Sequence, residues 1–190
     1  MNLQTVKLGD IAIQDKVIVS PDFAEALTRP YLGLDQIESQ TGKIISYAST
    51  SREGKSTTFA FNESHILYGK LRPYLNKVAL PECKGRCSTE IIPLLPNGVD
   101  REFLAFLLRC EDIVAVAMSE KTGSRMSRTD MDALLSMEVV IPESIIDQRQ
   151  IAAKLKVQLA EVETARKAAE MQLAEIKRLP TRLLAQAFKL

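Results

Sequence analysis

Apolar side chains recur at a seven-residue spacing along the C-terminal forty residues of the chain. The stripe consists of Leu155, Val162, Ala169, Ile176 and Leu183, and Leu159 and Leu173 extend it. The segment 144–179 contains no Gly or Pro and is rich in Ala, Glu, Lys and Gln, which favour helix. The pattern predicts a helix about 54 Å long with a narrow apolar stripe on a charged surface.

Such a stripe predicts contact with a partner helix, because a long isolated helix buries too little apolar surface to be stable. The alternative is a helix that lies on its own globular domain. Ser144 is expected to cap the start, with Asp147 completing an imperfect capping box. Pro180 is expected to end or kink the helix and to leave a short terminal helix over Thr181–Phe188.

The first 143 residues alternate between short strand-like segments and polar turns. Strands are expected near 6–13, 31–34, 44–48, 59–61, 65–68, 89–95 and 137–142, and a turn over 81–87. Helical periodicity covers Asp100–Met118, and Thr129 is expected to cap a short helix over Asp130–Leu135. This order predicts an α+β fold in which 1–143 form one domain with a twisted, mainly antiparallel or mixed sheet, and 144–190 form the long helix.

Composition limits the class of protein. The chain has 190 residues, 46% of them hydrophobic, and a net charge of +1. No apolar run approaches the ~18 residues that a membrane span needs, and the N-terminus lacks an apolar signal core. Cys83, Cys87 and Cys110 are odd in number, which favours reduced thiols. We therefore expect a cytoplasmic protein without a membrane partner.

The charge is unevenly distributed. Residues 41–90 hold eight Lys or Arg and four Asp or Glu, a net charge of +4, whereas residues 91–150 hold six and ten, a net charge of −4. A basic central segment is compatible with a surface that binds a polyanion such as DNA, and also with a merely solvated surface.

No catalytic constellation stands out in the sequence. Gly54-Lys55-Ser56-Thr57 resembles the end of a phosphate-binding loop, but Ser49 stands where that pattern requires Gly. Asp22, Glu53 and Lys55 match the short PD…(D/E)xK pattern of Mg²⁺-dependent nucleases, although all three fall in polar loops. The three cysteines and His65 have no usual zinc spacing, and His65 is expected to be structural.

Several segments resemble the DNA-specificity (S) subunit of type I restriction-modification systems. The central one is Ile66-Leu67-Tyr68-Gly69-Lys70-Leu71-Arg72-Pro73-Tyr74-Leu75-Asn76-Lys77. Further matches, in the same order as in that family, are 6–11, 87–91, 94–96, 100–104, 123–127, 140–142 and 147–152. A usual S subunit has two target-recognition domains and two long antiparallel helices. This chain has one of each, so it looks like a half-subunit, with a fragment of a full subunit as the alternative.

The resemblance implies sequence-specific DNA recognition by a non-catalytic chain. It implies a methyltransferase (M) subunit that carries S-adenosylmethionine, a restriction (R) subunit that uses ATP and Mg²⁺, and no cofactor on this chain. A homodimer through the helix would read a bipartite palindromic site. A PD-(D/E)xK nuclease and a coiled-coil adaptor without DNA affinity are the alternatives.

Candidate DNA-binding residues are basic or polar residues of the central segment and of two exposed loops. Lys55, Lys70, Arg72, Lys77 and Arg86 are expected to contact phosphates, and the segments 49–57 and 123–128 to read bases. The 70–75 run is alternatively a structural strand and turn that supports these loops. The full set is Lys43, Ser49, Thr50, Ser51, Arg52, Lys55, Ser56, Thr57, Lys70, Arg72, Tyr74, Asn76, Lys77, Arg86, Ser124, Arg125, Ser127 and Arg128.

Overall fold

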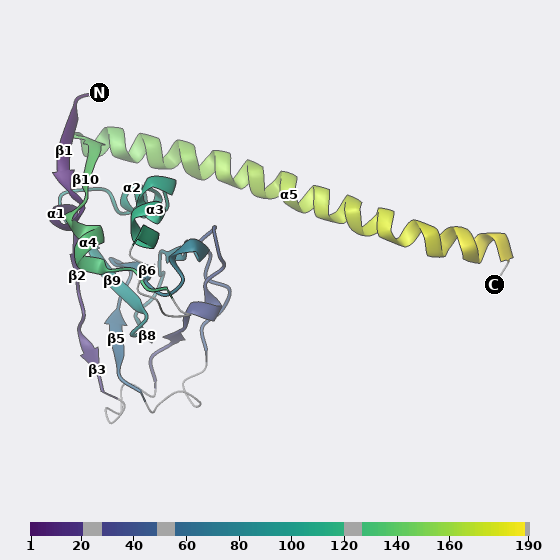
Figure 1. Ribbon diagram of the computed structural model, residues 1–190, viewed down its shortest axis with the longest axis horizontal. Helices are drawn as coiled ribbons and strands as arrows, with labels where there is room; N and C mark the ends of the chain where they lie inside the picture. The colour runs from purple at the N-terminus through teal and green to yellow at the C-terminus, as the bar shows by residue number, and fades with distance from the viewer. Residues whose placement is uncertain (21–27, 49–55, 120–126, 189–190) are drawn as a thin grey trace. The chain divides into compact units, whose positions relative to one another are not determined.

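The computed structural model describes residues 1–20, 28–48, 56–119 and 127–188 (Figure 1). The chain divides into two compact units, Met1–Arg149 and Gln150–Leu190. The first unit holds all strands of the described residues and the short helices. The second contains most of the long helix α5.

Three sheets build the first unit. The strand β1 (Leu3–Lys7) pairs with β10 (Glu138–Pro142). A second sheet has the order β2 (Ala12–Gln14), β9 (Ile91–Pro96), β6 (Ile66–Gly69) and β7 (Val78–Ala79). A third has the order β3 (Ile18–Val19), β5 (Thr58–Phe61), β8 (Gly85–Ser88) and β4 (Tyr31–Leu32), and only its β4–β8 pair is parallel among the described pairs. The predicted α+β fold with mainly antiparallel or mixed pairing is confirmed.

Buried side chains from several strands form one core of the first unit. Leu32, Phe61, Leu67, Cys87 and Ile91 come from five different strands and form a buried cluster. In β8, Cys87 faces this cluster, so Arg86 and Ser88 point to the opposite face of the sheet. Burial also raises the pKa of the Cys87 thiol to about 12. The third sheet thus has one apolar face and one face that carries polar side chains.

The short helices differ in detail from the sequence prediction. They are α1 (Leu8–Ile11), α2 (Arg101–Leu107), α3 (Glu111–Ser119) and α4 (Met131–Ser136). The single helix predicted over 100–118 is two helices. Asp130, not Thr129, caps α4, since its Oδ1 accepts from the N–H groups of Asp132 (2.8 Å) and Ala133 (3.1 Å). Thr129 is buried instead, 3.4 Å from the Tyr68 hydroxyl.

Three local predictions are wrong. Strand β8 begins inside the predicted turn 81–87, because pairing with β5 and β4 on both sides overrides the weak strand preference of its sequence, Gly-Arg-Cys-Ser. Residues 44–48 form isolated bridges, Ile44 with Ile37 and Ala48 with Tyr31, and no strand. Residues 8–11 form α1 rather than extended chain.

Helix α5 runs from Ile145 to Phe188 with Pro180 inside it. The predicted break at Pro180, with a separate terminal helix, is therefore wrong: one missing N–H donor does not end a helix whose neighbouring turns remain bonded. The Ser144 cap is confirmed, since its Oγ accepts from the N–H groups of Ile146 (3.2 Å) and Asp147 (3.5 Å). Among the helices of the described ranges, none combines the length and apolarity that crossing a membrane requires.

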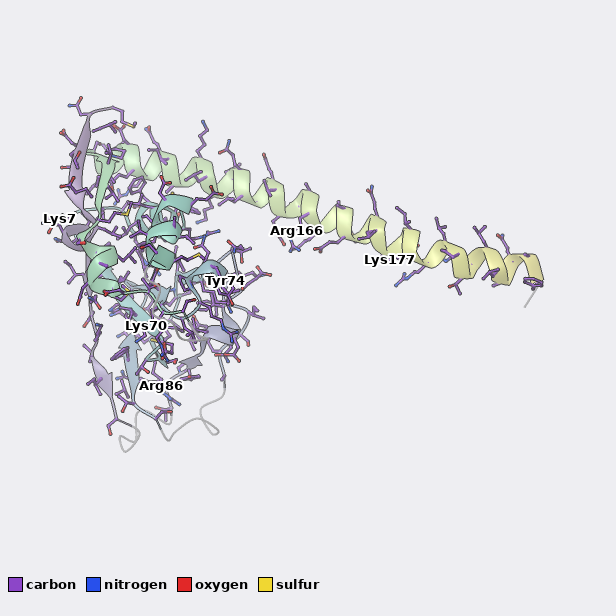
Figure 2. The ribbon with its side chains drawn as sticks, in the orientation of Figure 1. Lys7, Lys70, Tyr74, Arg86, Arg166 and Lys177 are labelled. Atoms are coloured by element: carbon purple, nitrogen blue, oxygen red, sulfur yellow. The ribbon has the colours of Figure 1, made fainter. Side chains whose placement is uncertain are left out.

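The stripe on α5 is open to solvent in the single chain. Val162 is 63% exposed, Ile176 60% and Leu183 62%, and Leu159, Ala169 and Leu173 are exposed too. Arg166, labelled in Figure 2, interrupts the stripe. It pairs with Glu163 (2.7 Å) and Glu170 (2.5 Å) on its own helix. The seven-residue pattern therefore describes a real apolar face of this helix.

Candidate nucleic-acid interface

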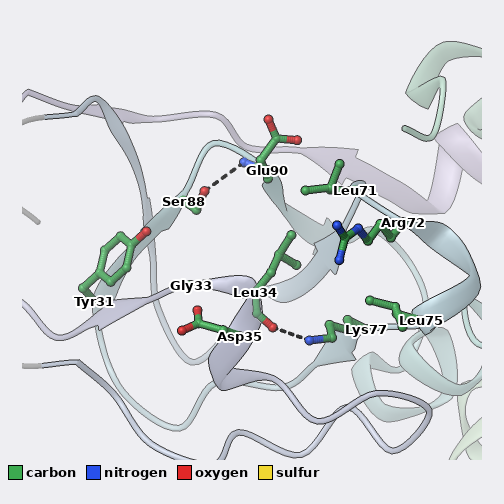
Figure 3. Close-up of a pocket in the computed structure, with 10 residues that line it drawn as sticks. All are labelled: Tyr31, Gly33, Leu34, Asp35, Leu71, Arg72, Leu75, Lys77, Ser88 and Glu90. Atoms are coloured by element: carbon green, nitrogen blue, oxygen red, sulfur yellow. Dashed lines mark hydrogen bonds between the residues drawn. The ribbon is translucent and has the colours of Figure 1, made fainter. Parts of the chain in front are cut away.

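A cavity of about 460 Å³ brings together three segments that lie far apart in the sequence. The first is Tyr31–Asp35 on β4 and the 3-10 turn η2 (Leu34–Gln36). The second is Leu71–Lys77, around the 3-10 turn η3 (Pro73–Leu75), and the third is Ser88–Glu90, at the end of β8 (Figure 3). The central resembling segment and the segment 87–91 thus meet at one cavity.

The turn η3 is held in an unusual backbone conformation. Arg72 (φ 53°) and Asn76 (φ 48°), which flank it, both have left-handed backbone angles, which side chains other than glycine adopt rarely. The Arg72 N–H donates to Ser127 O (2.9 Å), and Asn76 Nδ2 donates to Arg109 O (2.9 Å). These contacts fix a turn that presents Arg72 at the cavity and Tyr74, 48% exposed, at the surface.

The Lys77 side chain joins two of the segments that line the cavity. Its Nζ donates to the carbonyl oxygen of Leu34 at 2.5 Å, which ties η3 to η2. Burial lowers the pKa of the Lys77 ammonium, the nearby Asp35 carboxylate opposes this, and the Arg72 charge adds to the lowering. Lys77 therefore serves the structure of the cavity, while the more exposed Arg72 remains available to a ligand.

An ion pair closes another side of the cavity. Arg128 donates from Nε to Glu90 Oε2 (3.1 Å) and from Nη2 to Glu90 Oε1 (3.0 Å). These bonds raise the pKa of Arg128. The Lys70 N–H donates to Glu90 O (2.9 Å), and Lys70 O accepts from Thr129 N–H (2.8 Å). The chain that leaves the predicted base-reading segment 123–128 is thus fastened to the 70–75 run.

The predicted DNA-binding residues separate into three groups. Arg72 and Lys77 line the cavity, and Lys70 and Arg128 lie in the strands and turns beside it. Lys43, Ser56 and Thr57 are exposed elsewhere on the unit, while Asn76 and Ser127 are partly buried in contacts that hold η3. Ser49, Thr50, Ser51, Arg52, Lys55, Ser124 and Arg125 lie outside the described residues, as do Asp22 and Glu53 of the nuclease pattern.

Arg86 differs from the other predicted cations because it is only 1% exposed. Its Cζ lies 5.0 Å from the centre of the Tyr31 ring, a cation–π contact. From this position its side chain does not reach a phosphate on the protein surface, so the predicted phosphate contact does not fit the free chain.

His65 has a structural environment. It is 4% exposed, its Nε2 lies 3.1 Å from Asp15 Oδ2, and its Nδ1 lies 3.0 Å from the N–H of Asn62. Within the described ranges no three His, Cys, Asp or Glu side chains gather as a metal site would require.

Four cavity residues with polar side chains are absent from the set predicted from the sequence: Tyr31, Asp35, Ser88 and Glu90. Ser88 and Glu90 lie within the resembling segment 87–91, which was a usable signal. Tyr31 and Asp35 gave none, because their approach to the cavity depends on the parallel β4–β8 pair, which joins residues more than fifty positions apart.

Comparison with known proteins gives a consistent result. The family model "Type I restriction modification DNA specificity domain" matches residues 2–171. A curated relative is the specificity subunit of the type I restriction enzyme EcoDI of Escherichia coli, 27% identical over 160 residues, which are 84% of this chain and 36% of that protein.

Solved structures share the fold. One, described as "Structural basis underlying complex assembly and conformational transition of the type I R-M system", has a TM-score of 0.82 at 22% identity over 97% of this chain and 49% of that one. The crystal structure of the HsdS subunit from Thermoanaerobacter tengcongensis has a TM-score of 0.71 at 22% identity, over 87% and 44%. The chain thus spans about a third of the curated relative and under half of these solved chains.

Proposed function

The chain belongs to the family of type I restriction-modification DNA specificity domains, and from this premise we propose that it recognises a DNA sequence for a methyltransferase and restriction complex. The observation that carries the proposal is the cavity at which the resembling segments 66–77 and 87–91 converge. Arg72, exposed and held by a left-handed backbone, is the cation best placed there for an anionic ligand.

Affinity comes from contacts to phosphates. Arg72 binds a phosphate at the mouth of the cavity, and Lys70 contributes to the positive potential around it. Neutralising phosphates releases condensed counterions, so binding weakens steeply as salt rises. Lys77 keeps the turn η3 in place through its bond to Leu34.

Specificity comes from the polar segments 49–57 and 123–128, which carry Ser, Thr and Arg side chains able to bond to base edges. The bond from Arg72 N–H to Ser127 O and the Arg128–Glu90 pair join the end of the second segment to the phosphate-binding turn. The phosphate contact at η3 and the base contacts of segment 123–128 are thereby coupled, because a shift of η3 along the DNA backbone moves the residues that contact bases.

The exposed stripe of α5 supports self-association as a two-fold dimer. Antiparallel pairing of the stripe places Leu159 against Ile176 of the partner subunit, and Val162 against the partner subunit's Leu173. Near the centre Arg166 meets the partner's Ala169, which is small enough for the aliphatic stem of the arginine to pack over it. All three pairs follow from one register.

A two-fold dimer presents two recognition units to two half-sites, so the target is bipartite and palindromic. Helix α5 has 44 residues and is therefore about 66 Å long, which limits the separation of the half-sites to roughly nineteen base pairs. The methyltransferase partner supplies S-adenosylmethionine and the methyl transfer, and a restriction subunit supplies ATP- and Mg²⁺-dependent cleavage. This chain determines which DNA sequence the complex binds and supplies no catalytic group.

The test is a binding titration with short duplexes at several salt concentrations. The proposal predicts a log–log salt slope of several units, reduced by about one unit in Arg72→Ala. Binding that is absent at low salt contradicts the proposal and favours an adaptor without DNA affinity. Mg²⁺-dependent cleavage by the purified chain, lost in Glu53→Ala, supports the nuclease instead.

A further inference from the structure

One hydrogen-bonding edge of the buried arginine on β8 finds no partner in the part of the chain that the structure describes. Arg86 is 1% exposed, and its Nε and Nη2 atoms are both buried without an acceptor in the described part of the chain. Burying a cation without compensating bonds costs several kcal/mol. A fold keeps such a group when a ligand satisfies it, so Arg86 is a candidate for a binding role.

The two free atoms form the side of the guanidinium that makes paired hydrogen bonds. Arg128 shows the same edge in use, since its Nε and Nη2 donate to the two carboxylate oxygens of Glu90 at 3.1 and 3.0 Å. In Arg86 this edge has no acceptor among the described residues, and the Tyr31 ring, whose centre lies 5.0 Å from Cζ, restricts the movement of the guanidinium. Arg86 therefore offers a planar, preoriented pair of donors.

The position of Arg86 links it to the cavity of the proposed interface. It pairs with Tyr31 of β4 on one side and with Ala60 of β5 on the other. Ser88, two residues along β8 on the same face, lines the cavity together with Tyr31. Figure 2 shows Arg86 toward the end of the globular unit that carries β3.

We propose that Arg86 reads a guanine of the target, donating from Nε and Nη2 to guanine O6 and N7. Guanine is the base whose major-groove edge presents two adjacent acceptors, which match this pair of donors. The inference rests on the DNA-recognition function proposed above. It assigns Arg86 to base reading and leaves the phosphates to exposed cations such as Arg72.

Access to Arg86 requires a rearrangement on binding. A side chain that is 1% exposed in the free chain meets a base edge only after the surface above it moves. Loop rearrangements of this kind accompany a substantial minority of complexes. The bonds gained by the free guanidinium edge are made only in the bound state, so they favour the rearranged form when guanine is present.

The first test compares the motifs that the wild type and Arg86→Lys enrich from randomised duplex DNA. Lys keeps the charge but loses the paired donors. The expected result is a guanine position that the variant no longer prefers, with a loss of preference of about tenfold or more, while the other positions remain. Arg128→Lys is the matched control, because its edge already binds Glu90, and it should retain that guanine.

A second test needs no change to the protein and so does not depend on the folding of a variant. In the enriched duplex each guanine is replaced in turn by 7-deazaguanine, which lacks N7, or by hypoxanthine, which keeps O6 and N7. At one position 7-deazaguanine should weaken wild-type binding about tenfold while hypoxanthine is tolerated. Arg86→Lys should bind both duplexes equally.

Three results overturn the assignment. One is an Arg86→Lys motif identical to that of the wild type, and another is tolerance of 7-deazaguanine at every guanine. The third is a uniform loss of affinity with a reduced salt slope, which makes Arg86 a phosphate contact. If the wild type enriches no motif at all, the DNA-recognition function fails and the guanine contact falls with it.

Discussion

The side chain of Gln148 bonds to Asp100, at the start of α2, and to Pro142, at the end of β10, and so joins the two elements. Gln148 Oε1 accepts from the Asp100 N–H at 2.8 Å, and Nε2 donates to Pro142 O at 2.8 Å. Asp100 in turn caps α2, its Oδ1 accepting from Phe103 N–H (3.0 Å), while its Oδ2 lies 3.3 Å from Arg149 Nε. A glutamine that is 0% exposed thus satisfies one partly buried and one buried backbone group in the globular unit.

Gln148→Leu should destabilise the fold by about 2–4 kcal/mol, because it removes the partners of a partly buried donor, Asp100 N–H, and of a buried acceptor, Pro142 O. Urea denaturation followed by circular dichroism measures the change. Arg149→Met is the control at the neighbouring position. Its ion pair with Asp100 is exposed on the arginine side, so a loss below about 1 kcal/mol is expected. Equal losses for both variants would show that the Gln148 bridge is not the stabilising contact.

Arg72→Ala should weaken binding to any duplex about tenfold at moderate salt and leave sequence preference unchanged, because a phosphate contact carries no base information. Fluorescence anisotropy with labelled duplexes measures both quantities. Lys84→Ala removes an exposed cation from outside the cavity lining and is the matched control. A similar loss in the two variants would assign the affinity to net charge rather than to the turn η3.

Val162→Glu/Ile176→Glu should convert a dimer into a monomer, because both side chains are exposed in the single chain and become buried in the proposed pairing. Light scattering gives the mass. Ala160→Glu/Ala168→Glu adds the same charge outside the stripe and should remain dimeric. A monomeric wild type would contradict self-pairing and would leave the stripe for a different partner helix.

Alkaline pH should destabilise the globular unit through Cys87. Burial raises its pKa from 9.0 to about 12, so the folded state holds the thiol proton that the unfolded state releases. Stability due to this group is complete below pH 9 and is lost as pH rises from 9 toward 12, at up to about 1.4 kcal/mol per pH unit. Denaturation midpoints between pH 8 and 11 should fall less steeply in Cys87→Ala. If the midpoints of the wild type and of Cys87→Ala fell equally with pH, Cys87 would not contribute to the loss of stability.

The sequence predicted the features that depend on local periodicity and failed where long-range pairing decides. The stripe from Leu155 to Leu183 and the Ser144 cap could be read directly, because a helix repeats its own pattern. Strand β8 could not, because Gly85 and Arg86 become strand residues only through their neighbours on β4 and β5. Pro180 is the reverse case: its residue type predicts a break, but the helix continues through it because the neighbouring turns stay helical.

The candidate site was predicted in part for the same reason. Arg72 and Lys77 belong to a continuous resembling segment and could be identified from it. Tyr31 and Asp35 reach the cavity through a parallel strand pair, and Arg86 revealed its free edge only once its burial was known. Residue type alone does not distinguish an exposed arginine such as Arg72 from a buried one such as Arg86, which contacts the Tyr31 ring.

The most direct test of the central claim is enrichment of duplex DNA from a randomised pool by the wild-type chain, followed by sequencing. A two-fold dimer of recognition units predicts one enriched motif, made of two short inverted half-sites separated by a fixed gap of unspecified bases. Enrichment of no motif, with binding that depends on salt alone, would contradict sequence recognition by this chain.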